Sequence, residues 1–185
     1  MALTKSQMVE LGSFAPGFSL VDTVSGRVCT LPEKNSCKAV LVMFICNHCP
    51  YVTHVAAELA KIGKDYAQLG IEIFAISSND KNNYPADAPD KMKEVALANA
   101  YSFPYLFDDS QSVAKDYGAV CTPDFFLYEA KLELVYRGQL DDSRPGSGIP
   151  VTGCDLRRAM DSLLAGRKLE GVQNPSMGCN IKWRK

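Results

Sequence analysis

The most constraining feature of this sequence is a pair of cysteines at the junction between a strand and a helix. Residues 39–45 form a continuous apolar run rich in β-branched side chains, which predicts a strand covered on both faces. Cys46 and Cys49 follow directly. Beyond them, apolar residues recur three and four positions apart, which predicts an amphipathic helix that ends near Gly70. The cysteines therefore lie where a helix leaves a buried strand.

The rest of the chain predicts a single α/β domain, residues 1–185, with a tail of about 167–185 wrapping round it. The other predicted elements are a hairpin over 18–31, strands over 71–76, 104–107, 125–128 and 132–137, and helices over 89–100, 111–117 and 154–165. This order indicates a central mixed sheet flanked by helices, extended at its N-terminal end by the hairpin.

Composition narrows the classes of function. The net charge of −1 provides no positive field for nucleic acid, and no apolar run reaches the roughly 20 residues of a membrane span. The first residues lack the pattern of a secretory signal. The seven cysteines are odd in number and too few for a disulfide scaffold of this size. We therefore expect a cytoplasmic protein without a nucleic-acid or membrane partner.

The motif Cys46-Asn47-His48-Cys49 predicts thiol chemistry. A helix N-terminus stabilises a thiolate, so the pKa of a cysteine placed there falls. The spacing puts both sulfurs on one side of the first turn, where one can displace a group bound to the other. An imidazolium of His48 would stabilise the thiolate further and make the disulfide a stronger oxidant.

Two other interpretations of these residues remain open. Cys46, His48 and Cys49 offer three metal ligands, so a metal-binding module is an alternative of another class. A structural zinc site normally draws on a second cluster, and the sequence contains no second Cys-x-x-Cys pair. Buried packing cysteines are the other alternative. We favour the redox interpretation, with no bound metal or cofactor.

A second segment, Thr122-Pro123 before the strand at 125–128, completes a resemblance to the thioredoxin superfamily, in which such a dipeptide has a cis bond and faces the active site. More narrowly, the chain resembles the peroxiredoxin-like redoxins of the alkyl hydroperoxide reductase and thiol-specific antioxidant group. The segments that carry this likeness are 14–18, 44–52, 120–125, 136–142 and 175–183. The resemblance implies that Cys46 attacks, that Cys49 resolves and that Pro123 faces the substrate.

The sequence departs from these families at two points. The threonine that peroxiredoxins carry three residues before the reactive cysteine is absent, because Met43 and Cys46 occupy the corresponding positions. The buried aspartate of thioredoxin, six residues before the first cysteine, is Val40 here. Proton transfer to Cys49 must therefore use another base or water.

We expect a thiol-disulfide oxidoreductase that acts on a protein or small-molecule disulfide and is reset by an external thiol reductant. A thiol peroxidase that passes through a sulfenic acid is the alternative within the enzymes. Cys121 and Cys179 are candidate additional redox residues, because the first lies two residues before Pro123 and the second lies in the terminal tail. The redox potential is expected to be less reducing than the roughly −270 mV of thioredoxin.

Overall fold

The computed structural model describes residues 3–184. Its strands are β1 (Leu3–Lys5), β2 (Ser19–Asp22), β3 (Val28–Thr30), β4 (Ala39–Phe44), β5 (Ile71–Ser77), β6 (Tyr105–Phe107), β7 (Cys121–Thr122), β8 (Asp124–Glu129), β9 (Leu134–Gly138) and β10 (Met177–Asn180). Its helices are α1 (Pro50–Ala67), the 3₁₀ turn η1 (Pro85–Asp87), α2 (Pro89–Ala98), α3 (Ser112–Asp116) and α4 (Cys154–Leu164).

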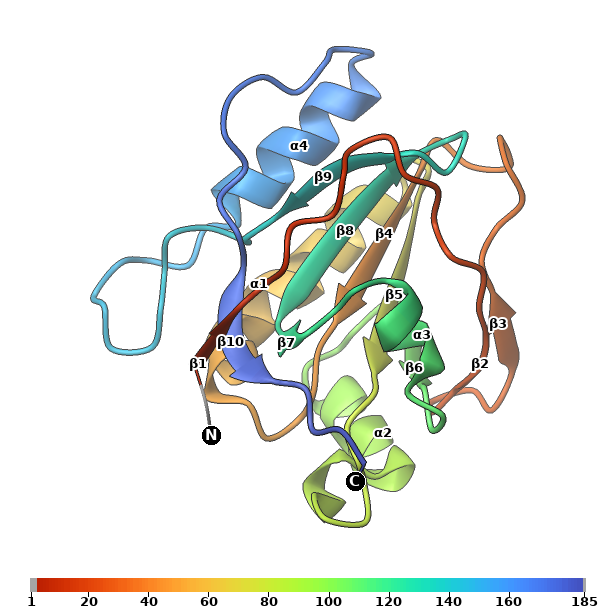
Figure 1. The fold of residues 1–185 in the computed structure, drawn as a ribbon, viewed down its shortest axis with the longest axis vertical. Coiled ribbons are helices and arrows are strands. Elements are labelled where there is room, and N and C mark those ends of the chain that lie inside the picture. Colours follow the sequence, from red (N-terminus) through yellow and green to blue (C-terminus); the bar gives the residue numbers. More distant parts are fainter. Residues whose placement is uncertain (1–2, 185) are drawn as a thin grey trace.

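A seven-stranded mixed sheet in the order β3-β2-β6-β5-β4-β8-β9 forms the centre of the molecule (Figure 1). Strands β4, β5 and β6 are parallel, whereas β8 and β9 run antiparallel to their neighbours. The hairpin β2–β3 joins the edge at β6. The predicted fold class, a thioredoxin-like mixed sheet flanked by helices with an N-terminal hairpin extension, is confirmed.

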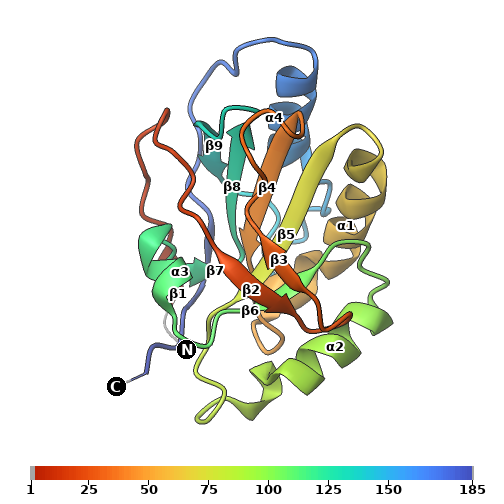
Figure 2. The same cartoon turned by 90° about the vertical axis from the view of Figure 1, so that its right-hand side faces the viewer.

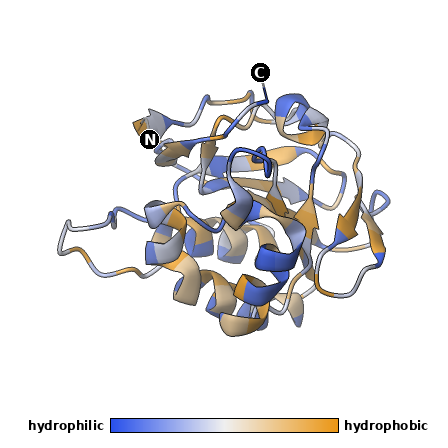
Figure 3. Cartoon of the chain, turned by 90° about the horizontal axis from the view of Figure 1, so that it is seen from below, coloured by the Kyte–Doolittle hydropathy of each residue, from blue (hydrophilic) through white to orange (hydrophobic). Residues whose placement is uncertain are grey.

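The sheet separates two hydrophobic layers. Every residue of β4 is buried, as the continuous apolar run predicts for a strand covered on both faces. Side chains of α1, α2 and α4 pack against one face, and side chains of α3 pack against the other. Figure 2 shows α1 and α3 on opposite sides of the sheet. In Figure 3 the helices carry both hydrophobic and hydrophilic residues, as expected for elements with one buried face.

A second, three-stranded sheet in the order β1-β10-β7 joins both ends of the chain to the short strand β7. The C-terminal strand β10 is its middle strand and runs antiparallel to both neighbours. Because β7 leads directly into β8 of the central sheet, this arrangement holds the C-terminal tail against the core of the domain.

The observed element boundaries differ from the predicted ones by a few residues. The strand expected from residue 132 begins at Leu134, because Leu132 has a positive φ of 64° and belongs to the preceding turn. The helix expected over 111–117 is limited to Ser112–Asp116, and Gln111 before it is also left-handed. Within residues 3–184, no helix is both long enough and apolar enough to cross a membrane.

Candidate active site

The two cysteines occupy different positions relative to helix α1. The helix begins at Pro50, so Cys49 is its N-cap residue, with extended backbone angles. Cys46 lies one turn earlier, in the loop that follows β4. The sequence placed both cysteines in the first turn of the helix. Only Cys49 therefore lies at the positive end of the helix dipole.

Cys49 is the sulfur that ionises most easily. Its pKa is lowered to about 5, first because the Cys46 thiol hydrogen-bonds to its sulfur. Burial opposes this fall, while the thiol of Cys179 and the N–H of Val52 add to it. In its protonated form, the Cys49 thiol donates to the carbonyl oxygen of Thr122 at 3.2 Å. Cys49 is fully buried, so a charge on its sulfur depends on these donors.

Cys46 is held as a thiol. Its pKa is raised well above the usual value, first because it hydrogen-bonds to the Cys49 sulfur, then because of burial and the negative charge of Asp87. The hydroxyl of Thr122 lies 3.3 Å from its sulfur. These pKa directions favour ionisation of Cys49, whereas the sequence led us to expect the thiolate on Cys46. The position of the helix agrees with this direction, since α1 starts at Pro50 and Cys49 is its N-cap residue.

Thr122 and Pro123 lie beside the cysteine pair, as the sequence predicted. The Thr122–Pro123 peptide bond is cis. Thr122 contacts both sulfurs, because its hydroxyl approaches Cys46 and its carbonyl accepts from Cys49. The segment between β7 and β8 therefore closes one side of the site.

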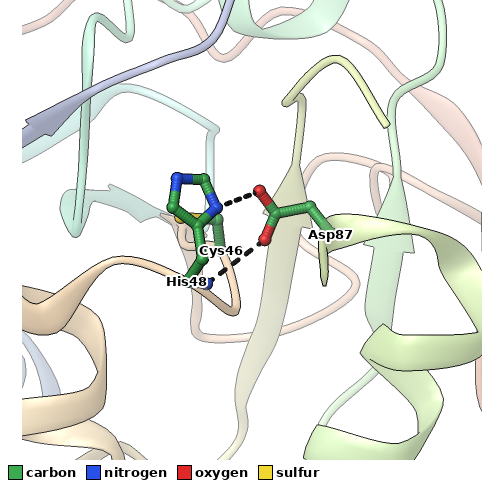
Figure 4. Close-up of side chains that lie close together, drawn as sticks. All are labelled: Cys46, His48 and Asp87. Carbon is green, nitrogen blue, oxygen red and sulfur yellow. Dashed lines mark hydrogen bonds and ion pairs between the residues drawn. The ribbon is translucent and has the colours of Figure 1, made fainter. Parts of the chain in front are cut away.

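His48 contacts a carboxylate in place of a thiolate. Its Nδ1 lies 2.5 Å from Oδ2 of Asp87, and its ring stacks on Tyr84. Figure 4 shows the Asp87 carboxylate bonded to both the ring and the backbone N–H of His48, with Cys46 behind the ring. Burial would raise the pKa of Asp87, but bonds from His48 and Asn79 outweigh it, and the net pKa is lowered. The predicted contact of His48 with a thiolate is therefore replaced by a hydrogen bond with Asp87.

Asp87 is the site residue that the sequence reading missed. It is fully buried in η1, between the predicted strand over 71–76 and the predicted helix over 89–100, where the sequence predicted no element. It also accepts hydrogen bonds from the backbone N–H groups of Asn47 and His48, at 2.8 and 3.3 Å. No local motif marks it, because its partners lie 39 and 40 residues away in the sequence.

A potential metal-binding group differs from the predicted one. Ligand atoms of Cys46, His48 and Asp87 lie within 4.8 Å of one another, so Asp87 takes the place that the sequence assigned to Cys49. An ion at this position would have to replace the hydrogen bond between His48 and Asp87. The donor set of sulfur, nitrogen and oxygen suits zinc, with three protein ligands.

The two candidate additional cysteines lie in different surroundings. The thiol of Cys121 is buried and donates weakly to the carbonyl of Pro123 at 3.9 Å, and burial followed by the charge of Asp124 raises its pKa. Cys179 lies on β10, opposite Thr122 in the strand register, and is buried in the same hydrophobic cluster as Cys46 and Cys49. The structure therefore brings Cys179, rather than Cys121, into contact with the pair.

A cavity of about 190 Å³ adjoins the loop that carries Cys46. Its lining residues are all uncharged: Ile45, Cys46, Asn47, Val52, Thr53, Ala56, Val95, Asn99, Tyr101 and Tyr105. This volume is below that of a typical drug-sized ligand pocket and suits a small molecule.

The fold and this dithiol site define a redoxin of the thioredoxin fold. The AhpC/TSA family matches residues 11–137, and the chain belongs to this family. An uncharacterized conserved protein from Geobacillus kaustophilus shares 50% identity and a TM-score of 0.96, covering 100% of this chain and 97% of that one. A hypothetical protein from Sinorhizobium meliloti shares 49% identity and a TM-score of 0.95, covering 98% of this chain and 98% of that one.

A more distant structure shares the fold alone. The thioredoxin domain of a thiol-disulfide oxidoreductase from Bacteroides vulgatus has 21% identity and a TM-score of 0.59, covering 70% of this chain and 89% of that one. A comparison with curated proteins gave no match. The family and the fold support redox chemistry at a cysteine without identifying the substrate.

Proposed function

We propose that this protein is a thiol-disulfide oxidoreductase that works through a Cys46–Cys49 dithiol-disulfide couple. Its substrate is a protein or small-molecule disulfide, an external thiol resets it, and no bound cofactor takes part. The observation that carries this proposal is the place of Cys49, which is the N-cap residue of α1 and whose pKa is lowered by the neighbouring Cys46 thiol. The cysteine usage favours a reducing compartment such as the cytoplasm.

In the first step the Cys49 thiolate attacks one sulfur of the substrate disulfide. A bond forms between Cys49 and that sulfur, the substrate S–S bond breaks, and the other half leaves as a thiolate. The Cys46 thiol lies within hydrogen-bond reach of Cys49 and can protonate the departing sulfur. Cys46 becomes a thiolate in the process, which prepares it for the second step.

In the second step the Cys46 thiolate attacks the Cys49 sulfur of the mixed disulfide. The Cys46–Cys49 bond forms, and the remaining half of the substrate leaves as a thiolate that takes a proton from water. The substrate has then gained two electrons and the protein has lost two. Asp87 contributes by charge, because its carboxylate favours the protonated form of Cys46 until a leaving group needs the proton.

Reaction with a small chromogenic disulfide tests the assignment of roles. Cys49→Ser is expected to slow the first step by at least 100-fold, because the ionised sulfur is lost. Cys154→Ser is the matched control, since Cys154 is the exposed cysteine of the described chain. Peptide mapping should find the Cys46–Cys49 disulfide in the oxidised wild-type protein. A Cys49→Ser variant that reacts as fast as wild type would refute the proposal.

The pH dependence of alkylation tests the ionisation that the proposal needs. Because the pKa of Cys49 is about 5, its alkylation rate should rise with pH around 5 and level off above about pH 6. An unperturbed thiol would reach half its maximal rate near pH 8.5. Rates at single cysteines can be followed by mass spectrometry of the digested protein. A midpoint above pH 8 for Cys49 contradicts the assignment.

A thiol peroxidase is the second candidate, favoured by the AhpC/TSA family and by the small cavity beside Cys46. In this reaction the Cys49 thiolate attacks a hydroperoxide and becomes a sulfenic acid, while an alcohol or water leaves. Cys46 then condenses with the sulfenic acid and releases water. Rapid consumption of hydroperoxide by the purified, reduced protein distinguishes this reaction from disulfide exchange.

A further inference from the structure

The strand edge beside the cysteine pair is covered by the protein's own C-terminal tail. In β10, Cys179 pairs with Thr122 and Asn180 pairs with Cys121, in antiparallel register. Figure 1 shows β10 between β1 and β7. The family resemblance implies that Pro123, which directly follows this edge, faces the substrate. Strand β10 therefore occupies the position of a substrate strand.

The fit between β10 and this edge is close and depends on Gly178. A Cβ atom on Gly178 would lie 2.0 Å from the carbonyl oxygen of Thr122 and 3.1 Å from Cδ of Pro123. Two further hydrogen bonds flank the paired residues. The hydroxyl of Ser176 donates to the carbonyl oxygen of Pro123 at 2.6 Å, and the N–H of Ile181 donates to the carbonyl oxygen of Val120 at 3.0 Å. The tail is thus held by contacts specific to this edge.

The same register brings a third sulfur to the cysteine pair. Cys179 is opposite Thr122, whose carbonyl oxygen accepts a hydrogen bond from the Cys49 thiol at 3.2 Å, so Cys179 and Cys49 both lie at the same residue of β7. Cys46, Cys49 and Cys179 are all buried in one hydrophobic cluster. Cys49 therefore has a possible disulfide partner on the tail as well as in its own loop.

We propose that β10 is an internal substrate strand and that Cys179 is a third redox residue, which takes over the disulfide from the Cys46–Cys49 pair. This inference rests on the proposed function, which supplies that disulfide. The sulfur of Cys179 attacks Cys49, so the Cys49–Cys179 bond forms and the Cys46–Cys49 bond breaks. The electron pair of the broken bond leaves on Cys46, which takes the proton that Cys179 loses. This exchange leaves the oxidation level of the protein unchanged.

An external dithiol then completes the cycle. One of its thiolates attacks Cys179, and Cys49 leaves, because the sulfur with the lower pKa is the better leaving group. The second thiol of the reductant releases Cys179 and becomes part of the reductant's own disulfide. Burial raises the pKa of Cys179 to about 12, and the neighbouring Cys49 adds to that rise through its charge, which is absent while Cys49 is in a disulfide.

The decisive experiment uses Cys46→Ser, oxidised with one equivalent of 2-hydroxyethyl disulfide. We expect Cys179 to displace the small thiol from Cys49, so that peptide mapping finds a Cys49–Cys179 disulfide. Cys46→Ser/Cys154→Ser, which lacks an exposed cysteine, should behave identically. Cys46→Ser/Cys179→Ser should instead keep the small thiol on Cys49. A stable mixed disulfide in Cys46→Ser, with Cys179 still open to alkylation, overturns the inference.

The wild-type protein provides a second measurement that does not depend on a variant. After partial oxidation and alkylation at low pH, both Cys46–Cys49 and Cys49–Cys179 disulfides should be found. If only the Cys46–Cys49 disulfide forms, the relay is wrong and the proposed function stands. If neither Cys46 nor Cys49 reacts, both fail.

Displacing the strand tests the internal-substrate role separately. Gly178→Ala should raise the alkylation rate of Cys179 at least tenfold, because the added Cβ cannot fit against Thr122. Gly17→Ala is the matched control, since a Cβ there meets nothing within 4 Å. An unchanged rate at Cys179 in Gly178→Ala contradicts the role of this edge.

Discussion

Two buried carboxylates near the cysteines, Asp87 and Asp124, show how surroundings decide the behaviour of one residue type. Asp87 accepts hydrogen bonds from two backbone N–H groups and the side chain of Asn79, and pairs with His48. Its pKa is lowered despite burial. Asp124 is also fully buried, but its only charged partner is Arg137 and its Oδ2 has no partner among residues 3–184. Burial raises its pKa to about 6, although Arg137 opposes that rise.

The comparison shows that the number of hydrogen-bond donors around a buried carboxylate, rather than its depth of burial, decides whether its pKa is lowered or raised. It also separates two roles. Asp87 holds the loop of His48 and biases the protonation of Cys46. Asp124 fixes Arg137, which stacks on Phe126 in the central sheet. Asp87 therefore acts on the groups of the candidate active site, whereas Asp124 stabilises the sheet that supports them.

Removing the supporting carboxylate should have the largest effect. Asp124→Ala leaves the guanidinium of Arg137 buried and uncompensated, so the free energy of unfolding should fall by about 3–5 kcal/mol. Urea denaturation measures this change. Asp116→Ala, at an exposed position on α3, should alter it by no more than about 0.5 kcal/mol. A loss below about 1 kcal/mol at Asp124 would contradict the supporting role.

The next largest effect is that of the ionised Cys49 sulfur on the redox potential of the cysteine pair. The lowered pKa keeps the Cys49 sulfur ionised at pH 7, which stabilises the reduced protein relative to one with an unshifted thiol. Equilibration with glutathione buffers should therefore give a potential above the roughly −270 mV of thioredoxin. A value at or below it would contradict the ionisation of Cys49.

Neutralising the carboxylate at the site should have a smaller effect on stability. Asp87→Asn replaces charged hydrogen bonds by neutral ones, so the free energy of unfolding should fall by about 2 kcal/mol. The pKa of Cys46 should fall as well, because Asp87 raises it. Alkylation of Cys46 against pH, compared between Cys49→Ser and Asp87→Asn/Cys49→Ser, measures that change. Identical profiles would show that Asp87 does not act on Cys46.

The cysteine beside Asp124 should matter least. Cys121→Ala removes a small buried side chain, with an expected loss of about 1 kcal/mol in urea denaturation. The rate of disulfide exchange should stay at the wild-type value, because Cys121 contacts Pro123 and Asp124 rather than the pair. A fall in rate of more than about threefold would give Cys121 a redox role.

The sequence alone determined the order of strands and helices, the Cys46–Cys49 pair after β4 and the Thr122-Pro123 segment. These features depend on local periodicity and short motifs, and the thioredoxin-like fold follows from them. Only the tertiary structure decided that Cys49 caps α1, that Asp87 pairs with His48 and that Cys179 reaches Cys49. The first depends on a helix boundary that propensity locates to within a few residues. The other two join residues 39 and 130 positions apart, and no local pattern records such contacts.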